Sequence, residues 1–113
     1  MEKIRKIAAN YIYIPGFPLT KNGYVVVENG KVTVVDTGGK IREIAGLEFY
    51  GGMIVPDYVK GNKDLFCVGA PFLPVLEKLL TEKGMVYKGL AIIEGADLRE
   101  FIWLSVADIR ILH

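Results

Sequence analysis

The sequence feature that most restricts the fold is a pair of β-branched runs on either side of an Asn-Gly dipeptide. Residues 24–27 are Tyr-Val-Val-Val, residues 32–35 are Val-Thr-Val-Val, and Asn29-Gly30 lies between them. Asn and Gly both tolerate the positive φ of a two-residue hairpin turn, and β-branched residues favour strands. The pattern therefore predicts an antiparallel β-hairpin.

Further short apolar runs separated by Gly and Pro extend the β pattern along the chain. We expect a strand over 4–14, bent near 8–10 and ended by Pro15, because proline cannot donate a hydrogen bond to a sheet. Another strand is expected to end at Pro56. The other expected strands lie around Phe49 and at 53–55, joined by a Gly51-Gly52 turn, and at 89–93, 98–104 and 109–111. The predicted fold is mainly β, a β-sandwich or partly open barrel.

One segment has helical periodicity instead. Its apolar residues recur at steps of three and four, which places them on one helix face. Pro71 and Pro74 are compatible only with a first turn, and Gly84 stands where a left-handed C-cap falls. We predict one short amphipathic helix over 71–84, whose apolar face is Phe72, Leu73, Leu76, Leu79 and Leu80. Residues 40–45 are expected to form a helical turn or irregular structure, and 56–70 to be the least regular part.

The length and composition indicate one domain with apolar surface to share. The chain has 113 residues and no linker or repeat, so we expect a single domain over 1–113. Its parts are an N-terminal β part (1–65), the helix (71–84) and a C-terminal β part (85–113). A hydrophobic content of 51% is high for so short a chain. It indicates a partner, most simply a second copy in a homodimer.

Charge and cysteine usage exclude several classes of protein. The formal net charge is +1 without a basic run, so we expect no nucleic acid partner. No apolar run approaches the roughly 20 residues that span a bilayer, and we see no signal peptide. Cys67 is the single cysteine of the sequence, which excludes an intramolecular disulfide and fits a cytoplasmic location.

Few residues could carry chemistry. The sequence has one histidine, His113, so we expect no catalytic residues, no metal and no cofactor. Without a base beside it, Cys67 is expected to be buried and inert. We take Asp57, Asn62 and Asp64 as candidate ligand-binding residues. Their oxygens would suit a weak Ca²⁺ or Mg²⁺ site, and solvated loop side chains are the commoner alternative.

The hairpin over 25–35, the segment Gly52-Met53-Ile54-Val55-Pro56 and the segment 89–98 together carry a resemblance. They resemble the two ends of amidohydrolases of the cytosine-deaminase or chlorohydrolase type. In that family both ends of the chain form one small composite β-sandwich, and the catalytic metal-binding barrel is inserted between them. The family has Pro-Gly and a His-x-His metal pair where this chain has Pro56-Asp57 and Asn62-Lys63-Asp64.

Only residues 66–87 separate the two halves, which is too short for a barrel. The resemblance therefore implies a non-catalytic binding or interaction module, derived from a β-domain that has lost its barrel and its metal histidines. One alternative is an accessory part of a metal-dependent hydrolase acting on C–N bonds, with the barrel on another chain. Another is a small-ligand binding protein with a cleft near 57–64. We expect the flank left bare by the missing barrel to be covered by the 72–80 helix, by a second copy, or by both.

Overall fold

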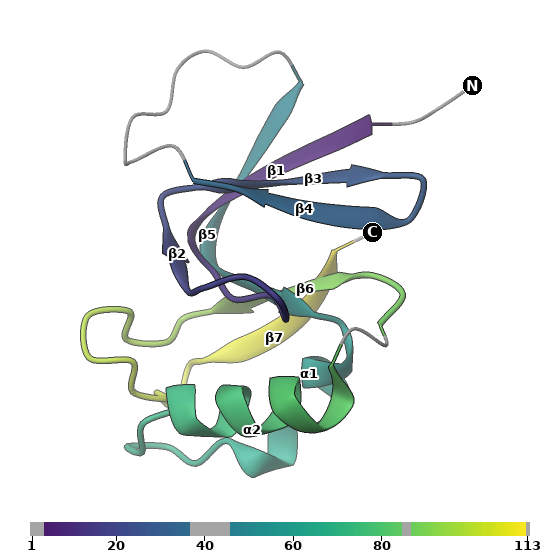
Figure 1. Cartoon of the computed structure of the whole chain (residues 1–113). Coiled ribbons are helices and arrows are strands. Elements are labelled where there is room, and N and C mark those ends of the chain that lie inside the picture. The colour runs from purple at the N-terminus through teal and green to yellow at the C-terminus, as the bar shows by residue number, and fades with distance from the viewer. Residues whose placement is uncertain (1–3, 37–45, 85–86, 113) are drawn as a thin grey trace.

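The computed structural model describes residues 4–36, 46–84 and 87–112, which form a curved sheet with helices on one side (Figure 1). The predicted mainly β fold is confirmed: within the described residues one seven-stranded sheet is present, and it is not closed into a barrel. The strands are β1 (Ile4–Ile12), β2 (Thr20–Lys21), β3 (Tyr24–Glu28), β4 (Lys31–Val35), β5 (Leu47–Pro56), β6 (Leu90–Glu94) and β7 (Asp108–Leu112). The helices are α1 (Tyr58–Gly61) and α2 (Leu73–Lys83), with a 3₁₀ turn at Lys63–Leu65. The expectation for 40–45 lies outside the described residues.

The strand order is β4-β3-β1-β5-β6-β7, with the short β2 beside β1. Neighbouring strands are antiparallel except β1 and β5, which run parallel. Strands β4 and β7 are therefore the two edges of the described sheet. The N-terminal and C-terminal parts of the chain join in it through the pairing of β5 with β6.

The predicted hairpin is confirmed in detail. β3 and β4 pair from Tyr24↔Val35 to Glu28↔Lys31. The two residues between them have positive φ, 51° at Asn29 and 76° at Gly30. This is the turn geometry whose twist matches that of the flanking strands.

The expected Gly51-Gly52 turn is wrong, because β5 continues through both glycines without a chain reversal. β1 pairs with β5 at Ala9↔Tyr50 and again at Tyr11↔Met53, so β5 holds one extra residue. At Gly52 φ is 138°, and a Cβ there would lie 2.1 Å from the carbonyl oxygen of Ile93. The glycine therefore serves a bulge and a close approach to β6, not a chain reversal. The bend of β1 was predicted near 8–10, and the register shift with β5 falls at these residues, between Ala9 and Tyr11.

The expected strand over 98–104 is also wrong. The segment consists of turns, with isolated bridges from Ile102 to Pro71 and Asp97, and Phe101 has a φ of 58°. Its Trp103 is still buried, stacked on Phe66 at a ring-centroid distance of 4.7 Å, whereas Leu104 is exposed. A loop that covers a core can be as apolar as a strand, so composition alone could not separate the two. By contrast, the strands expected at 89–93 and 109–111 are confirmed as β6 and β7.

Two buried clusters occupy the two faces of the sheet. On one face α2 packs its predicted apolar stripe against β5, β6 and β7, and Gly84 follows with a φ of 57°. The residues of this helix-side cluster are Met53, Val55, Val59, Phe66, Phe72, Leu76, Leu79, Ala91, Ile93, Trp103, Ala107 and Ile109. Fully burying such a side chain stabilises the fold by about 1.5–3 kcal/mol, which explains why the helix lies here.

On the other face the sheet curves, so that β1 and the β3–β4 hairpin lie over β5, β6 and β7 (Figure 1). The residues of this inner cluster are Ile7, Ala9, Ile12, Ile14, Val25, Ile54, Leu90, Ile92 and Leu112. Half-buried hydrophobic side chains surround it, among them Phe17, Val32 and Val34. The inner cluster therefore reaches the surface beside β4, where the curved sheet stays open.

Candidate functional site

The structure places the predicted ligand residue Asp57 directly after β5. Its carboxylate oxygen Oδ2 accepts a hydrogen bond from the Gly89 amide at 3.0 Å. Its own amide donates to the Gly89 carbonyl, also at 3.0 Å. These two hydrogen bonds of Asp57 therefore connect the segment before β6 to the end of β5.

The other two predicted residues lie in the turns that follow. The Asn62 side-chain nitrogen donates to the Tyr58 carbonyl at 2.8 Å and so closes α1. Asp64 is exposed in the 3₁₀ turn. Two of the three candidates thus satisfy backbone groups. In residues 4–36, 46–84 and 87–112, no three His, Cys, Asp or Glu side chains are grouped so that they could hold a metal ion.

Cys67 is exposed, so its predicted burial is wrong. The chain turns outward after Phe66, which takes the buried position against Trp103, and the Ala70 amide donates to the Cys67 carbonyl at 3.0 Å. The thiol therefore lies on the solvent side of this turn.

Sequence reasoning missed a cavity of about 210 Å³ at the open end of the inner cluster. Ile7, Val32, Leu90 and Leu112 form apolar walls, and the cations Arg5 and Lys88 also line it. Lys88 is exposed, and Gly89, held by Asp57, belongs to the same rim. With Val27, the apolar walls come from five strands, β1, β3, β4, β6 and β7, so no local motif could reveal the cavity.

Arg5 is already paired at this cavity. Its Nε and Nη2 donate to the two carboxylate oxygens of Glu48 at 2.6 and 3.0 Å, and the Tyr50 hydroxyl donates to the same carboxylate at 3.2 Å. The hydrogen bond from Arg5 lowers the pKa of Glu48, and the same pairing raises the pKa of Arg5. Lys88 is therefore the cation that a ligand in the cavity would meet first.

Tyr87 also lines the cavity, and Tyr58 packs against it. The rings of Tyr58 and Tyr87 meet edge to face at 6.3 Å, and the Tyr58 hydroxyl donates to the Gly84 carbonyl at 3.1 Å. Burial raises the pKa of Tyr58 to about 12, helped by Tyr87 and the negative charge of Asp57. Burial raises the pKa of Tyr87 as well, so both tyrosines stay neutral at ordinary pH.

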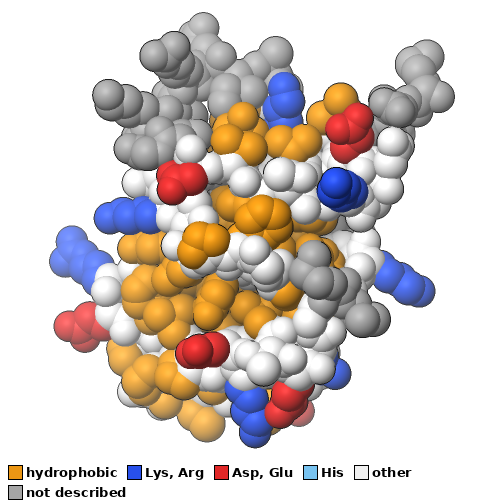
Figure 2. Space-filling view, in the orientation of Figure 1, with side chains coloured by type: hydrophobic (Ala, Val, Ile, Leu, Met, Phe, Trp, Pro, Cys, Tyr) orange, Lys and Arg blue, Asp and Glu red, His pale blue; other side chains and the backbone are white. Residues whose placement is uncertain are grey.

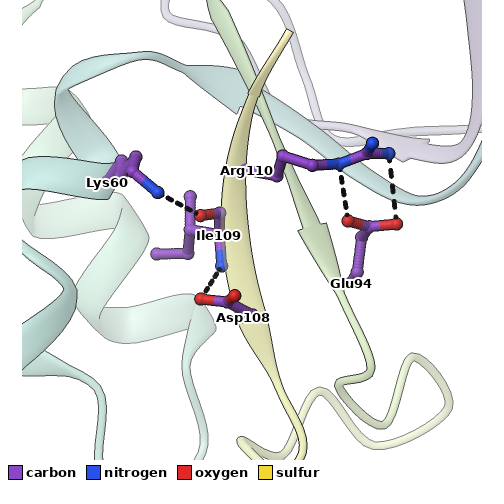
Figure 3. Close-up of polar contacts among 5 residues, drawn as sticks. All are labelled: Lys60, Glu94, Asp108, Ile109 and Arg110. Carbon is purple, nitrogen blue, oxygen red and sulfur yellow. Dashed lines mark hydrogen bonds and ion pairs between the residues drawn. The ribbon is translucent and has the colours of Figure 1, made fainter.

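Side chains cap the β7 edge of the sheet at Ile109 (Figure 3). The Lys60 ammonium, from α1, donates to the Ile109 carbonyl at 2.9 Å, and the Asp108 carboxylate accepts the Ile109 amide hydrogen at 2.8 Å. Lys63 in turn donates to Asp108 at 2.6 Å. Both polar backbone groups that Ile109 presents at this edge are thus occupied.

The β4 edge differs from the β7 edge in what surrounds it. Within the described part of the chain, no backbone group outside β3 pairs with β4. Figure 2 shows hydrophobic side chains gathered below the β3–β4 hairpin and above α2, with charged side chains mostly around them. An edge strand beside apolar surface is a site where another chain can add a strand.

Comparison with known proteins returned no matching family model, no matching curated protein and no matching solved structure. Among the helices of the described residues, none has the length and apolar character needed to cross a membrane.

Proposed function

We propose that this protein is a non-catalytic interaction module that forms a homodimer through the β4 edge of its sheet. The observation that carries the proposal is a difference between the two edges of the described sheet. Side chains occupy the outward amide and carbonyl of Ile109 on β7. β4 has the half-buried Val32 and Val34 and the apolar surface beside them instead. Proteins close the edges that must not associate, so an open edge marks a docking site.

The non-catalytic character rests on the sequence. One histidine and one cysteine, which is exposed, give no partner set for nucleophilic or metal chemistry. The carboxylates named as ligand candidates include Asp57, which is bound to the Gly89 amide. We therefore assign it a structural role at the rim of the cavity.

We further propose that the module derives from an amidohydrolase composite β-domain. The pairing of β5 with β6 supports this origin, because it joins the two ends of the chain in one sheet with only 66–87 between them. The alternative, an accessory part of a C–N hydrolase with its barrel on another chain, needs a partner of a different sequence. A complex of the purified module with such a barrel protein would establish it.

The dimer is tested by native mass spectrometry and light scattering of the wild-type protein and the Thr33→Lys variant. Thr33 is exposed at the centre of β4, and lysines there would meet across the edge. Thr81→Lys makes the same change on the exposed side of α2. We expect a dimer for the wild type and Thr81→Lys, and a monomer for Thr33→Lys. A monomeric wild type at tens of micromolar concentration rejects the proposal.

The cavity supports a second candidate function, binding of a small amphipathic carboxylate. Its walls would hold the apolar part, and Lys88 would meet the charge. The probe is octanoate, titrated calorimetrically against wild type and Lys88→Ala, with octanol as the uncharged control. We expect octanoate to bind more tightly than octanol, and Lys88→Ala to remove the difference. Equal affinity of both probes for the wild type excludes this function.

A further inference from the structure

We infer that two copies of this chain pair β4 with β4 in antiparallel fashion, about a two-fold axis that passes beside Thr33. This inference rests on the proposed dimer and specifies its register. It follows from the hydrogen-bond pattern of the hairpin, from the alternation of side chains and from the capping of β7 at Ile109.

The hairpin determines which backbone groups of β4 point outward. In a two-residue hairpin the residues flanking the turn, here Glu28 and Lys31, exchange both of their backbone hydrogen bonds. Because such pairs alternate along an antiparallel ladder, Thr33 and Val35 also bond to β3. The amides and carbonyls of Val32 and Val34 therefore point away from β3, toward the open edge.

These four outward groups are complementary to their own two-fold copy. With Thr33 opposite the partner's Thr33, Val32 lies opposite the partner's Val34. The Val32 amide then donates to the carbonyl of the partner's Val34, whose amide donates back to the Val32 carbonyl. The symmetric pair repeats this, so four hydrogen bonds satisfy every outward group of Val32 and Val34. An axis centred on Val32 would pair Val34 with the partner's Gly30, which belongs to the Asn29-Gly30 turn. An axis centred on Val34 would pair Val32 with the partner's Asp36, which lies beyond the end of β4.

The side chains support the same register. Val32 and Val34 belong to the inner face, so each would meet the other's copy and extend the inner cluster across the interface. Thr33 would meet its copy on the outer face, where Thr–Thr pairs are favourable. Lys31 would lie opposite the partner's Val35, so no like charges face each other.

The pairing would also shield apolar surface. Phe17, Val32 and Val34 are half-buried where the inner cluster reaches the open side of the sheet. Figure 2 shows the hydrophobic side chains of this side of the molecule below the hairpin. An added strand would lie along this surface, which gives the association an apolar contribution beyond the four hydrogen bonds.

Disulfide trapping tests the register. We would place Thr33→Cys in a Cys67→Ser background, so that the exposed native thiol does not react. Non-hydrogen-bonded antiparallel pairs have Cα atoms about 4.5 Å apart, within the range of a disulfide. Diamide, which takes up the two electrons and two protons of two thiols, should convert most of the Thr33→Cys chains to covalent dimers within minutes. Lys31→Cys is the control, since its copy would lie about 13 Å away along the strands.

The outcomes separate the inference from the proposed function. Rapid cross-linking of Thr33→Cys with little cross-linking of Lys31→Cys supports the register. If the wild type is dimeric and both cysteine variants cross-link at equal rates, the register is wrong but the dimer is retained. A monomeric wild type overturns both.

Hydrogen exchange of the unmodified protein gives a second test that needs no cysteine variant. We expect the amides of Val32 and Val34 to exchange at least tenfold more slowly at dimeric than at monomeric concentrations. The Ile111 amide, which points outward on β7 by the same alternation, should not change. Protection of Ile111 without protection of Val32 and Val34 would place the interface at the other edge and reject the inference.

Discussion

The side-chain oxygen of Asn10 accepts the amide hydrogen of Gly52 at 2.9 Å, across the parallel pair β1 and β5. The bond lies where the pairing register shifts between Ala9 and Tyr11. A bulge leaves one backbone group of the longer strand without its ladder partner, and Asn10 supplies that partner. The irregularity in the centre of the sheet is therefore held by specific residues.

Gly52→Ala should destabilise the protein strongly. The added Cβ would meet the Ile93 carbonyl oxygen at 2.1 Å, and a φ of 138° is disfavoured for any residue with a side chain. We expect a loss of roughly 2 kcal/mol or more in the free energy of unfolding, measured by urea denaturation. Gly51→Ala is the matched control, since the nearest atom to its Cβ is Asn10 Oδ1 at 3.9 Å. It should change stability by less than about 1 kcal/mol. Equal losses at both glycines would contradict the bulge.

Asn10→Ala should cost about 1–3 kcal/mol, because it leaves the buried Gly52 amide without an acceptor. Asn10→Asp keeps an oxygen at the same position and should recover much of this loss. The same denaturation experiment measures both variants. If Asn10→Ala were as stable as the wild type, the hydrogen bond would not be what holds the bulge.

Removing the caps of β7 should create a second associating edge. In the double variant Lys60→Met with Asp108→Ala, both polar groups of Ile109 lose their side-chain partners. We expect oligomers larger than the wild-type form by light scattering, and at least tenfold faster hydrogen exchange of the Ile109 amide. The control, Lys78→Met with Asp64→Ala, changes exposed residues of the same types. An unchanged mass for the double variant would show that side chains at β7 do not block association.

The β7 cap should also respond to acid. The hydrogen bonds from Lys63 and from the Ile109 amide lower the pKa of Asp108 below its ordinary value of 3.8. A lowered pKa in the folded state means that this stabilisation is complete above pH 3.8 and is lost as the pH falls below it. Exchange of the Ile109 amide, corrected for the intrinsic rate, should therefore accelerate only in that acidic range. Acceleration near pH 6 would contradict the assignment.

Alkaline titration should reveal the half-buried pair Tyr58 and Tyr87. Burial raises the pKa of Tyr58 from 10.0 to about 12, so its neutral form is favoured in the folded state. A raised pKa in the folded state means full stability below pH 10 and a loss of stability between pH 10 and about 12. Tyr58→Phe, which lacks the hydroxyl bound to the Gly84 carbonyl, should be less stable at pH 8 by about 0.5–1.5 kcal/mol. Its stability should also fall less steeply with pH. Parallel curves for the two proteins would reject this interpretation.

Local patterns were sufficient for several elements. Asn29-Gly30 between β-branched runs predicted the β3–β4 hairpin, because positive φ at both positions is a local requirement. The leucines of α2 predicted its buried face, since helical spacing alone brings them together. The ends of β5 at Pro56 and of α2 before Gly84 follow from the chemistry of single residues.

Local patterns failed where a distant segment determined the outcome. Gly51-Gly52 resembles a turn because glycines mark turns, but pairing with β1 and β6 keeps this segment in one strand as a bulge. The segment 98–104 resembles a strand in its apolar run from Phe101 to Leu104, but it covers the core as a loop that buries Trp103. Cys67 was expected to be buried with its apolar neighbours, and the outward turn after Phe66 exposes it.

By itself, the sequence determined a β-rich chain with one tight hairpin and one amphipathic helix, since these depend on backbone preferences within a few residues. Only the tertiary structure decided the parallel pairing of β1 with β5, the cavity among five strands and the difference between the two sheet edges. Lys60 closes the edge at Ile109 from 49 residues away, and Asp57 holds Gly89 from 32 residues away. Such contacts arise from how the sheet curves and which strands become its edges, and these depend on burying the whole apolar surface together.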